Sequence, residues 1–390
     1  MDTGAVMSRL TRAETQQRNR AGVLSAARAE FATRGYREAT VDGIAERAGL
    51  TRGAVYSNFP GKRALYFAVL ADDAEHAPDL PHPAPGRTPG EALGAYARAT
   101  MARLPVTTDA PPALDLVPEV LDDDRVRRPY AQLLKLQAIL LGLALEQAGA
   151  RQAPGGRPRA GPAGAPGQRR VRVAEAALTT LQGASVLART SPGFVEPFHV
   201  VATCEHLGDL DLDDRWQPLY ADYVPPPRPA DEPWPQPATG GADAAPRDAV
   251  HGAPVDLRAD GVVAVLGLHR LAAIEDAVRA APPGAHVTAI LVSGTPGELM
   301  PLARLMLAEF RRCLSAAFPR RAWPGLRIVY DESGALAAAA GVDAVSDATE
   351  SAVRVVSGRI TARAEGYGAC LAVAGAAGAV AFRHRDARGA

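Results

Sequence analysis

The chain has 390 residues, of which 47% are hydrophobic, 5% aromatic and 22% charged, and its 43 basic side chains are balanced by 43 acidic ones. This is the composition of a globular protein, and the length predicts two or three folded units. No run of about 18 apolar residues occurs, and the N-terminus lacks an apolar signal segment. We therefore expect a cytoplasmic protein without a membrane partner.

The neutral total conceals a basic N-terminal end. Residues 1–70 hold eleven basic and six acidic side chains. A locally basic segment on a neutral protein is typical of a module that binds phosphate groups.

Three helices are predicted between residues 20 and 70. The first carries an apolar stripe and ends at Gly35, a residue suited to the left-handed position after a helix. Thr40 can cap a second helix that ends at Gly49, and Thr51 can cap a short third helix that leads to Phe59, which we assign to the core. Two capped helices joined by so tight a turn indicate a helix-turn-helix, with the third helix as the reader.

The segment TVDGIAERAGLTRGAVYSNFPGKRALYFAVL, residues 40–70, resembles the tetracycline-repressor (TetR) family of transcriptional regulators. The resemblance covers residues 20–70 and implies that the third helix enters the major groove of DNA. Carried over by position, it implies base contacts at the start of that helix and phosphate contacts around it. The expected DNA-binding residues are Thr51, Arg52 and Ala54 near bases, Thr40, Tyr56 and Lys62 near phosphates, and Gly53, which leaves room for close approach.

Two of these residues also have a direct chemical argument. The guanidinium of Arg52 fits the O6 and N7 atoms of guanine, so Arg52 is the expected specificity residue. Lys62 follows Gly61 at the start of a fourth helix, where backbone N–H groups and the helix dipole already favour an anion.

Long helices are predicted over residues 91–104, 130–149, 171–189 and 197–210. In length and helicity, residues 71–223 resemble the effector-binding and dimerisation region of the TetR family. That resemblance implies a small-molecule effector and a homodimer formed through residues 171–210, whose twofold symmetry requires a pseudo-palindromic operator in double-stranded DNA. The expected packing faces are Val173, Ala177, Leu181 and Ala184 on one helix and Phe198, Val201, Ala202 and Leu207 on the other.

Two breaks rich in proline and glycine interrupt the chain. Residues 154–167 read as a loop between helices. Residues 224–254 contain nine prolines, which are incompatible with a helix or a central strand, so this segment is interpreted as a semi-rigid linker and the main boundary.

After the linker the pattern changes to strands and helices. Short β-branched runs at residues 261–268 and 286–292 flank a helix and predict a βαβ unit. A long amphipathic helix over 298–318, a strand at 326–330, and a hairpin turning at Ser357 and Gly358 follow. The last stretch, 369–377, is a candidate closing helix.

The segment LRIVYDESGALAAAAGVDAVSDATESAVRVVSGRITARAEGYG, residues 326–368, resembles the second half of redoxin domains, and the thioredoxin-like resemblance covers residues 255–380. Redox-active members carry a low-pKa cysteine after the second strand, but this chain has Ser293–Glu298 there and no cysteine. The proline that family members carry before the hairpin is also missing, since Ala348, Thr349 and Glu350 stand there. We therefore expect an inactive domain used for packing, partner binding or ligand sensing.

The three cysteines, Cys204, Cys313 and Cys370, form no paired motif, which argues against a disulfide framework or a zinc module. His199 and His206 flank Cys204 in the sequence, but the two histidines are separated from each other by two helical turns, roughly 10 Å, which is too far for them to share a metal ion. No catalytic residue, metal or cofactor is expected.

The predicted protein is multidomain, with an all-α N-terminal regulator followed by an α/β thioredoxin-like domain. Its parts are a helix-turn-helix domain (1–70), a helical effector-binding and dimerisation domain (71–223), a linker (224–254) and a redox-inactive α/β domain (255–390). The predicted function is a DNA-binding transcriptional regulator, a ligand-released repressor rather than an enzyme. The alternative is a thiol-dependent oxidoreductase of the thioredoxin type with an attached DNA-binding domain.

Overall fold

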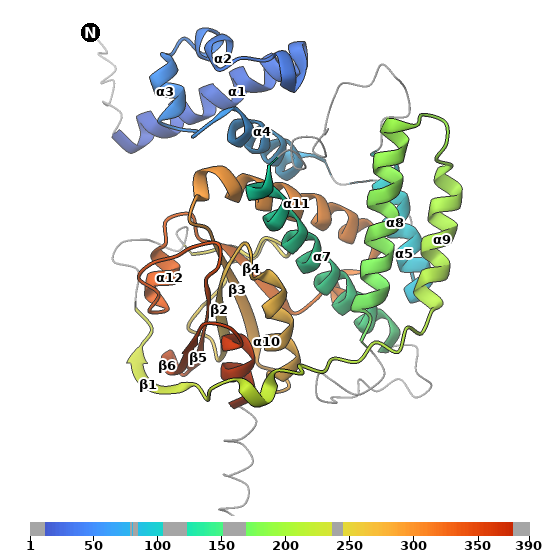
Figure 1. Ribbon diagram of the computed structural model, residues 1–390, viewed down its shortest axis with the longest axis vertical. Coiled ribbons are helices and arrows are strands. Elements are labelled where there is room, and N and C mark those ends of the chain that lie inside the picture. The colour runs from blue at the N-terminus through green and yellow to red at the C-terminus, as the bar shows by residue number, and fades with distance from the viewer. Residues whose placement is uncertain are drawn as a thin grey trace, which may run out of the picture.

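The computed structural model describes residues 12–78, 80, 85–103, 123–150, 169–235 and 245–376. Figure 1 shows the helices α1, α2 and α3 at one end of the molecule and α4 leading from them toward its centre. A sheet lies at the opposite end, and the helices α5, α8 and α9 stand together on one side. The loop predicted over residues 154–167 lies outside the described residues.

The N-terminal helices form where the sequence predicts them. A break in α1 occurs at Gly35, whose φ of 71° is left-handed, and Gly49 ends α2 with a φ of 65°. Thr40 and Thr51 cap α2 and α3 as expected. The bounds are α1 (Arg12–Glu38), α2 (Val41–Ala48), α3 (Arg52–Tyr56) and α4 (Lys62–His76).

The four predicted helices of the middle region are present: three agree within three residues at their ends, and α7 begins six residues before its predicted start. They are α5 (Pro89–Met101), α7 (Asp124–Ala150), α8 (Val171–Thr190) and α9 (Pro197–Asp209). The helix α5 packs on α9, and α8 packs on both α7 and α9. Leucines of α7 that face inward, such as Leu133, Leu136 and Leu140, are fully buried.

A mixed sheet of six strands, in the order β1-β6-β5-β2-β3-β4, follows the helical region. The strands β2, β3 and β4 are parallel, whereas β5, β6 and β1 are added antiparallel. The hairpin turns at Ser357 and Gly358, both with positive φ, as the sequence predicts. The bounds are β1 (Arg228–Pro233), β2 (Gly261–Gly267), α10 (Ile274–Ala280), β3 (His286–Val292), α11 (Pro296–Ala317), β4 (Leu326–Tyr330), α12 (Ala335–Ala339), β5 (Glu350–Val356) and β6 (Arg359–Glu365).

The order of elements after residue 254 agrees with the sequence prediction, including a helix from residue 369 through 376. The thioredoxin-like identity of this region stays a prediction.

The interpretation of residues 224–254 as a linker is wrong for much of the segment. Residues Arg228–Pro233 form β1, which pairs antiparallel with β6, and Trp234 is buried in the core of the sheet. Asp248 and Val250 are also buried. Proline-rich sequence is compatible with this role because β1 is an edge strand, whose outer N–H groups need no partner.

The central strands are buried on both faces, and alternate residues belong to different cores. Val262, Ala264 and Leu266 of β2 join the large core that also contains the helices, whereas Val263 and Val265 join a smaller core under α12. Period-two alternation explains why these strands read as unbroken apolar runs.

The large core is continuous from the N-terminal helices to the sheet. The helix α11, which belongs to the C-terminal region in sequence, packs on α4, α5 and α7. The helical region and the C-terminal region are therefore joined by a shared hydrophobic core. The division of the chain into separate domains stays a prediction.

The packing faces predicted for a dimer need correction. Val173, Ala177, Leu181 and Ala184 are buried inside this chain, so they cannot meet a second copy. On α9 Val201 and Leu207 are partly buried against the same core, whereas Phe198 and Ala202 of the predicted face are exposed. A helix in a bundle has two apolar faces, and the sequence pattern does not say which one meets the rest of its own chain.

A buried ion-pair network joins α7 to α10. The guanidinium of Arg279 donates to both oxygens of Glu146 at 2.7 Å and to Glu275 at 3.3 Å. Arg169 donates to both oxygens of Glu275 at 2.6 Å and also binds Asp214, which is buried. Because these charges are desolvated, removal of one partner leaves the others uncompensated.

We expect Arg279→Met to destabilise the protein by about 3–5 kcal/mol, because Glu146 and Glu275 would remain buried without this cation. The matched control is Arg215→Ala, which removes an ion pair with Asp213 in which both side chains are exposed and should change stability by less than about 0.5 kcal/mol. Chemical denaturation monitored by circular dichroism measures both. Equal unfolding midpoints for the two variants would contradict the role assigned to the network.

Candidate nucleic-acid interface

The short helix α3 is held at its start by a cap and on one side by buried anchors. The side-chain oxygen of Thr51 accepts a hydrogen bond from the amide of Ala54 at 3.2 Å. Val55 and Phe59 are almost completely buried, which confirms the assignment of Phe59 to the core. The opposite side of α3 is therefore fixed toward the outside.

Most of the predicted base-contacting positions lie on that outer side. Thr51, Arg52 and Gly53 are exposed and Ala54 is partly exposed. A Cβ atom added at Gly53 would meet nothing closer than 3.9 Å, so the space in front of this position is open. Their contacts with DNA stay a prediction, which this accessibility supports.

Arg52 is exposed and held by two neighbours. Its Nη1 donates to Asp42 of α2 at 3.1 Å, and its guanidinium lies 5.5 Å from the centre of the Tyr56 ring. The hydrogen bond with the Tyr56 hydroxyl and the charge of Asp42 raise the pKa of Arg52, so the group stays a cation. Because the ion pair with Asp42 is exposed, it is weak enough for a stronger anionic or guanine partner to replace it.

The predicted phosphate-contacting residues have different environments. Thr40 is exposed, but its hydroxyl oxygen already accepts from the amide of Gly43 at 3.0 Å. Tyr56 is 41% exposed. Lys62 donates to the carbonyl oxygens of Arg37 and Ala39 at 3.0 and 2.9 Å and lies 4.6 Å from the Tyr36 ring centre.

Lys62 therefore stabilises the C-terminal end of α1 through hydrogen bonds, and it is also a candidate for phosphate contact. An ammonium has three N–H donors, of which two are used here. Loss of Lys62 would change the local structure together with any phosphate contact, so it is a poor single test of DNA binding.

Sequence reasoning missed Arg20, which contacts the residues that directly follow the reader helix α3. Its Nη1 donates to the carbonyl of Asn58 at 3.0 Å, and its guanidinium lies 4.4 Å from the ring centre of Phe59. Arg20 is far from Asn58 in sequence, so no local pattern could have shown this contact.

Sequence reasoning also missed the connection between α4 and the C-terminal region. Arg63, in the first turn of α4, donates to Asp123 at 2.6 Å and also binds Glu298 in the first turn of α11. The basic residue after Lys62 thus ties the N-terminal helices to α7 and α11.

The cysteine positions give no support to the thiol-oxidoreductase alternative. All three cysteines are free and buried. Burial raises the pKa of Cys204 to about 11 and raises that of Cys370 well above its usual value, so these thiols stay protonated. In the segment Ser293–Glu298, which the thioredoxin-like prediction aligns with the reactive cysteine of redoxins, Ser293 is buried and its hydroxyl donates to Asp347 at 2.7 Å.

The described residues were also compared with the requirements of a metal site and of a membrane-spanning helix. Among those residues, no group of three His, Cys, Asp or Glu side chains is arranged to hold a metal ion. None of the helices there is both long and apolar enough to cross a bilayer.

Comparison with known proteins identifies the N-terminal module. The family model of the bacterial regulatory proteins of the tetR family matches residues 23–69. The chain is 42% identical over 79 residues to the HTH-type transcriptional regulator SrpR of Pseudomonas putida, and equally to the uncharacterized HTH-type transcriptional regulator TtgW of the same species. The N-terminal part of this chain is therefore a helix-turn-helix domain of the tetR family.

The two sequence matches cover limited parts of the proteins involved. Each spans 19% of this chain, with 37% of SrpR and 58% of TtgW. A solved TetR transcriptional regulator from Rhodococcus sp. RHA1 aligns with 52% of this chain at 19% identity, with a TM-score of 0.30. NalD of Pseudomonas aeruginosa aligns with 50% at 22% identity, with a TM-score of 0.28.

We expect Arg52→Ala to lower the preference for a specific DNA sequence over random duplex by about ten- to a hundredfold, because a bidentate contact with guanine would be lost. The melting temperature should not change, since the side chain is exposed. The matched control is Arg98→Ala, which removes a similarly exposed ion pair with Glu205 far from α3. Fluorescence anisotropy with selected and random duplexes measures the preference, and the same loss in both variants would refute the assignment.

Proposed function

We propose that this chain is a DNA-binding transcriptional regulator that binds a pseudo-palindromic operator as a homodimer and acts as a repressor released by a small molecule. The observation that carries the proposal is the outward presentation of α3, with Thr51 and Arg52 exposed on a helix anchored by buried Val55 and Phe59. In a helix-turn-helix, this geometry lets the start of the reader helix reach base edges in the major groove.

The names of similar proteins support this proposal. SrpR is a transcriptional regulator, and Rv1474c of Mycobacterium tuberculosis, 42% identical over 53 residues, is a transcriptional repressor. That match covers 14% of this chain and 28% of the repressor, so it concerns the helix-turn-helix module.

The proposed dimer uses the outer face of α8 and α9. Phe194 and Phe198 are 74% and 82% exposed, and Leu187 of α8, which lines one groove together with Phe194, is also exposed. A groove of about 340 Å³ runs between the two helices, and a Cβ added at Gly183 would meet no atom within 4 Å. Large apolar side chains around an open groove favour burial against an identical surface.

This face lies within residues 171–210, the range expected from the sequence, and it keeps Phe198 of the predicted packing face while adding Leu187 and Phe194. Phe198, in the first turn of α9, is the most exposed large apolar side chain of this face. A twofold axis through this face would present two α3 helices to one duplex, and two half-sites then follow from symmetry.

Selection from a random duplex library with the full chain tests the DNA-binding proposal. We expect a pseudo-palindromic sequence to be enriched and to bind at least about a thousandfold more tightly than random duplex at the same salt concentration. The affinity should fall with increasing salt because phosphate contacts release counterions. Equal affinity for the selected and random duplexes would reject the proposal.

We expect Phe198→Asp to convert the dimer to a monomer, because a carboxylate would have to be buried in the interface. The melting temperature of the monomer should stay close to that of the parent chain, because this side chain is exposed. Operator affinity should fall at least about tenfold. Leu219→Asp, at an apolar side chain that is 88% exposed outside α8 and α9, is the matched control.

Sedimentation equilibrium distinguishes the outcomes. A Phe198→Asp variant that remains dimeric at the concentration where the parent chain is dimeric would show that the dimer uses another surface.

A further inference from the structure

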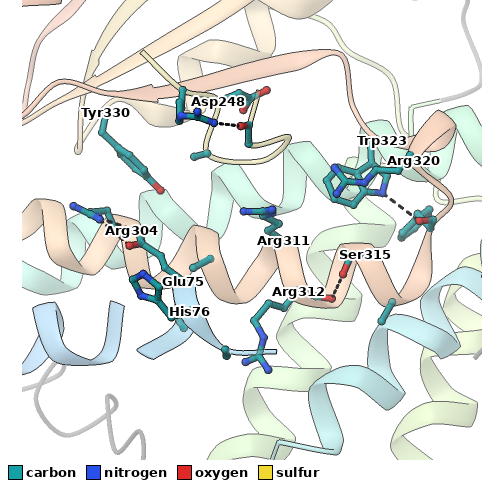
Figure 2. Close-up of a pocket in the computed structure, with 18 of the residues that line it drawn as sticks. Glu75, His76, Asp248, Arg304, Arg311, Arg312, Ser315, Arg320, Trp323 and Tyr330 are labelled. Carbon is teal, nitrogen blue, oxygen red and sulfur yellow. Dashed lines mark hydrogen bonds and ion pairs between the residues drawn. The ribbon is translucent and has the colours of Figure 1, made fainter. Parts of the chain in front are cut away.

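A pocket of about 960 Å³ lies between α4, α11 and the loops beside β4. Figure 2 shows Arg304 and Tyr330 at one end of this pocket, Arg320 and Trp323 at the other, and Arg311 between them. The walls therefore come from the helix that follows the helix-turn-helix and from the C-terminal region.

The charge of the lining is strongly unbalanced. Two acidic residues line the pocket, Glu75 and Asp248, against five arginines, namely Arg247, Arg304, Arg311, Arg312 and Arg320. Like charges repel when they are brought together, so such a cluster needs anions to neutralise it.

Both acidic residues are already engaged. Glu75 accepts two hydrogen bonds from Arg304 at 2.9 and 2.7 Å. Asp248 is buried and accepts from the amides of Val250 and Ile328, and its second oxygen lies 2.6 Å from Nδ1 of His251. Their charges are therefore directed to Arg304 and to the loop, away from the remaining arginines.

Three of the remaining cations have neutral contacts or none, whereas Arg312 lies 3.8 Å from a carboxylate oxygen of Glu309 and donates to the carbonyl of Pro78 at 3.3 Å. Arg247 donates to the carbonyl of Gly252 at 3.0 Å. Arg320 contacts the carbonyl of His251 at 3.5 Å and lies 4.1 Å from the Trp323 ring centre. For Arg311, the described part of the chain provides no hydrogen bond or ion pair, and the side chain is exposed toward the pocket.

This arrangement fits an anion with more than one negative charge. Guanidinium groups bind carboxylate and phosphate oxygens through paired N–H donors, and several of them around one space can hold several anionic groups. Tyr330 adds a neutral hydroxyl, because burial raises its pKa and keeps it protonated. The volume exceeds that of a single inorganic anion and falls within the range of small-molecule sites.

We propose that this arginine pocket binds a small organic anion carrying two or more negative charges, and that its occupancy regulates DNA binding through α4. The second part rests on the proposed function. Glu75, near the end of α4, and Arg304 of α11 form an ion pair at the pocket wall, and a bound anion competes with Glu75 for that guanidinium. Occupancy thereby changes the contact between α4 and α11, and with it the placement of the helix-turn-helix.

Isothermal titration calorimetry of the full chain with two probes, inorganic pyrophosphate and citrate, tests the site at constant ionic strength. We expect saturable binding of at least one probe with one site per chain, and the stronger probe indicates phosphate or carboxylate chemistry. The double variant Arg311→Ala/Arg320→Ala should weaken this binding at least about tenfold, because charge-assisted hydrogen bonds are lost. Arg258→Ala, at an exposed arginine outside the pocket, should leave it unchanged.

Failure of both probes to bind saturably, or equal weakening by Arg258→Ala, overturns the site. Both variants change exposed side chains, and matching melting temperatures verify that they fold.

Operator affinity with and without the saturating probe tests the regulatory part, again at constant ionic strength because DNA binding depends on salt. We expect at least about a fivefold change in the parent chain and none in the double variant. Probe binding without a change in DNA affinity overturns the regulatory role. If the chain without the probe shows no preference for any DNA sequence, the proposed function is refuted. The calorimetric result tests the binding site independently of that outcome.

Discussion

The burial of α4 on nearly all its sides is the constraint on which the rest of the structure depends. Every residue from Ala64 to Ala71 is buried, although a helix at the edge of a small DNA-binding module would normally expose one face. The helix packs on α1 within the helix-turn-helix unit and on α11 of the C-terminal region. The reader helix is therefore positioned by a core that includes a helix lying more than two hundred residues further along the chain.

Two polar contacts determine how α4 and α11 lie against each other. Arg63 binds Glu298 where both helices begin, and Glu75 binds Arg304 farther along them. Apolar packing between two helices allows small sliding motions, whereas ion pairs at separated points select one arrangement. The second pair lies at the wall of the arginine pocket, so the same contact that fixes the helices is accessible to a competing anion. This gives the C-terminal region a physical connection to the DNA-binding end.

Local signals made the helix-turn-helix predictable. Thr40 and Thr51 cap helices through contacts three residues away, and Gly49 adopts the left-handed conformation that ends a helix. Gly35, with positive φ, breaks α1, which continues to Glu38. The hairpin was predictable for the same reason, because its turn depends on the two adjacent residues Ser357 and Gly358.

The role of α11 could not be predicted. Its amphipathic pattern shows that one face must pack on other residues, but it does not show that these residues belong to α4. The pocket arginines, spread from residue 247 to 320, become neighbours only after folding. Likewise, the pattern of prolines excluded a central strand over 224–254 but could not exclude the edge strand β1.

The end of β3 is closed by a side-chain hydrogen bond, and one face of the sheet packs on the helices. Ser293 is buried there and its hydroxyl bonds to Asp347, whose segment leads into β5. A thiolate at this position would need exposure and stabilisation by a helix, whereas this hydroxyl closes the position with a hydrogen bond. The face of the sheet formed by Val262, Ala264 and Leu266 joins the core of the helices instead. The sheet therefore shares its core with α11, and α11 in turn packs on α4.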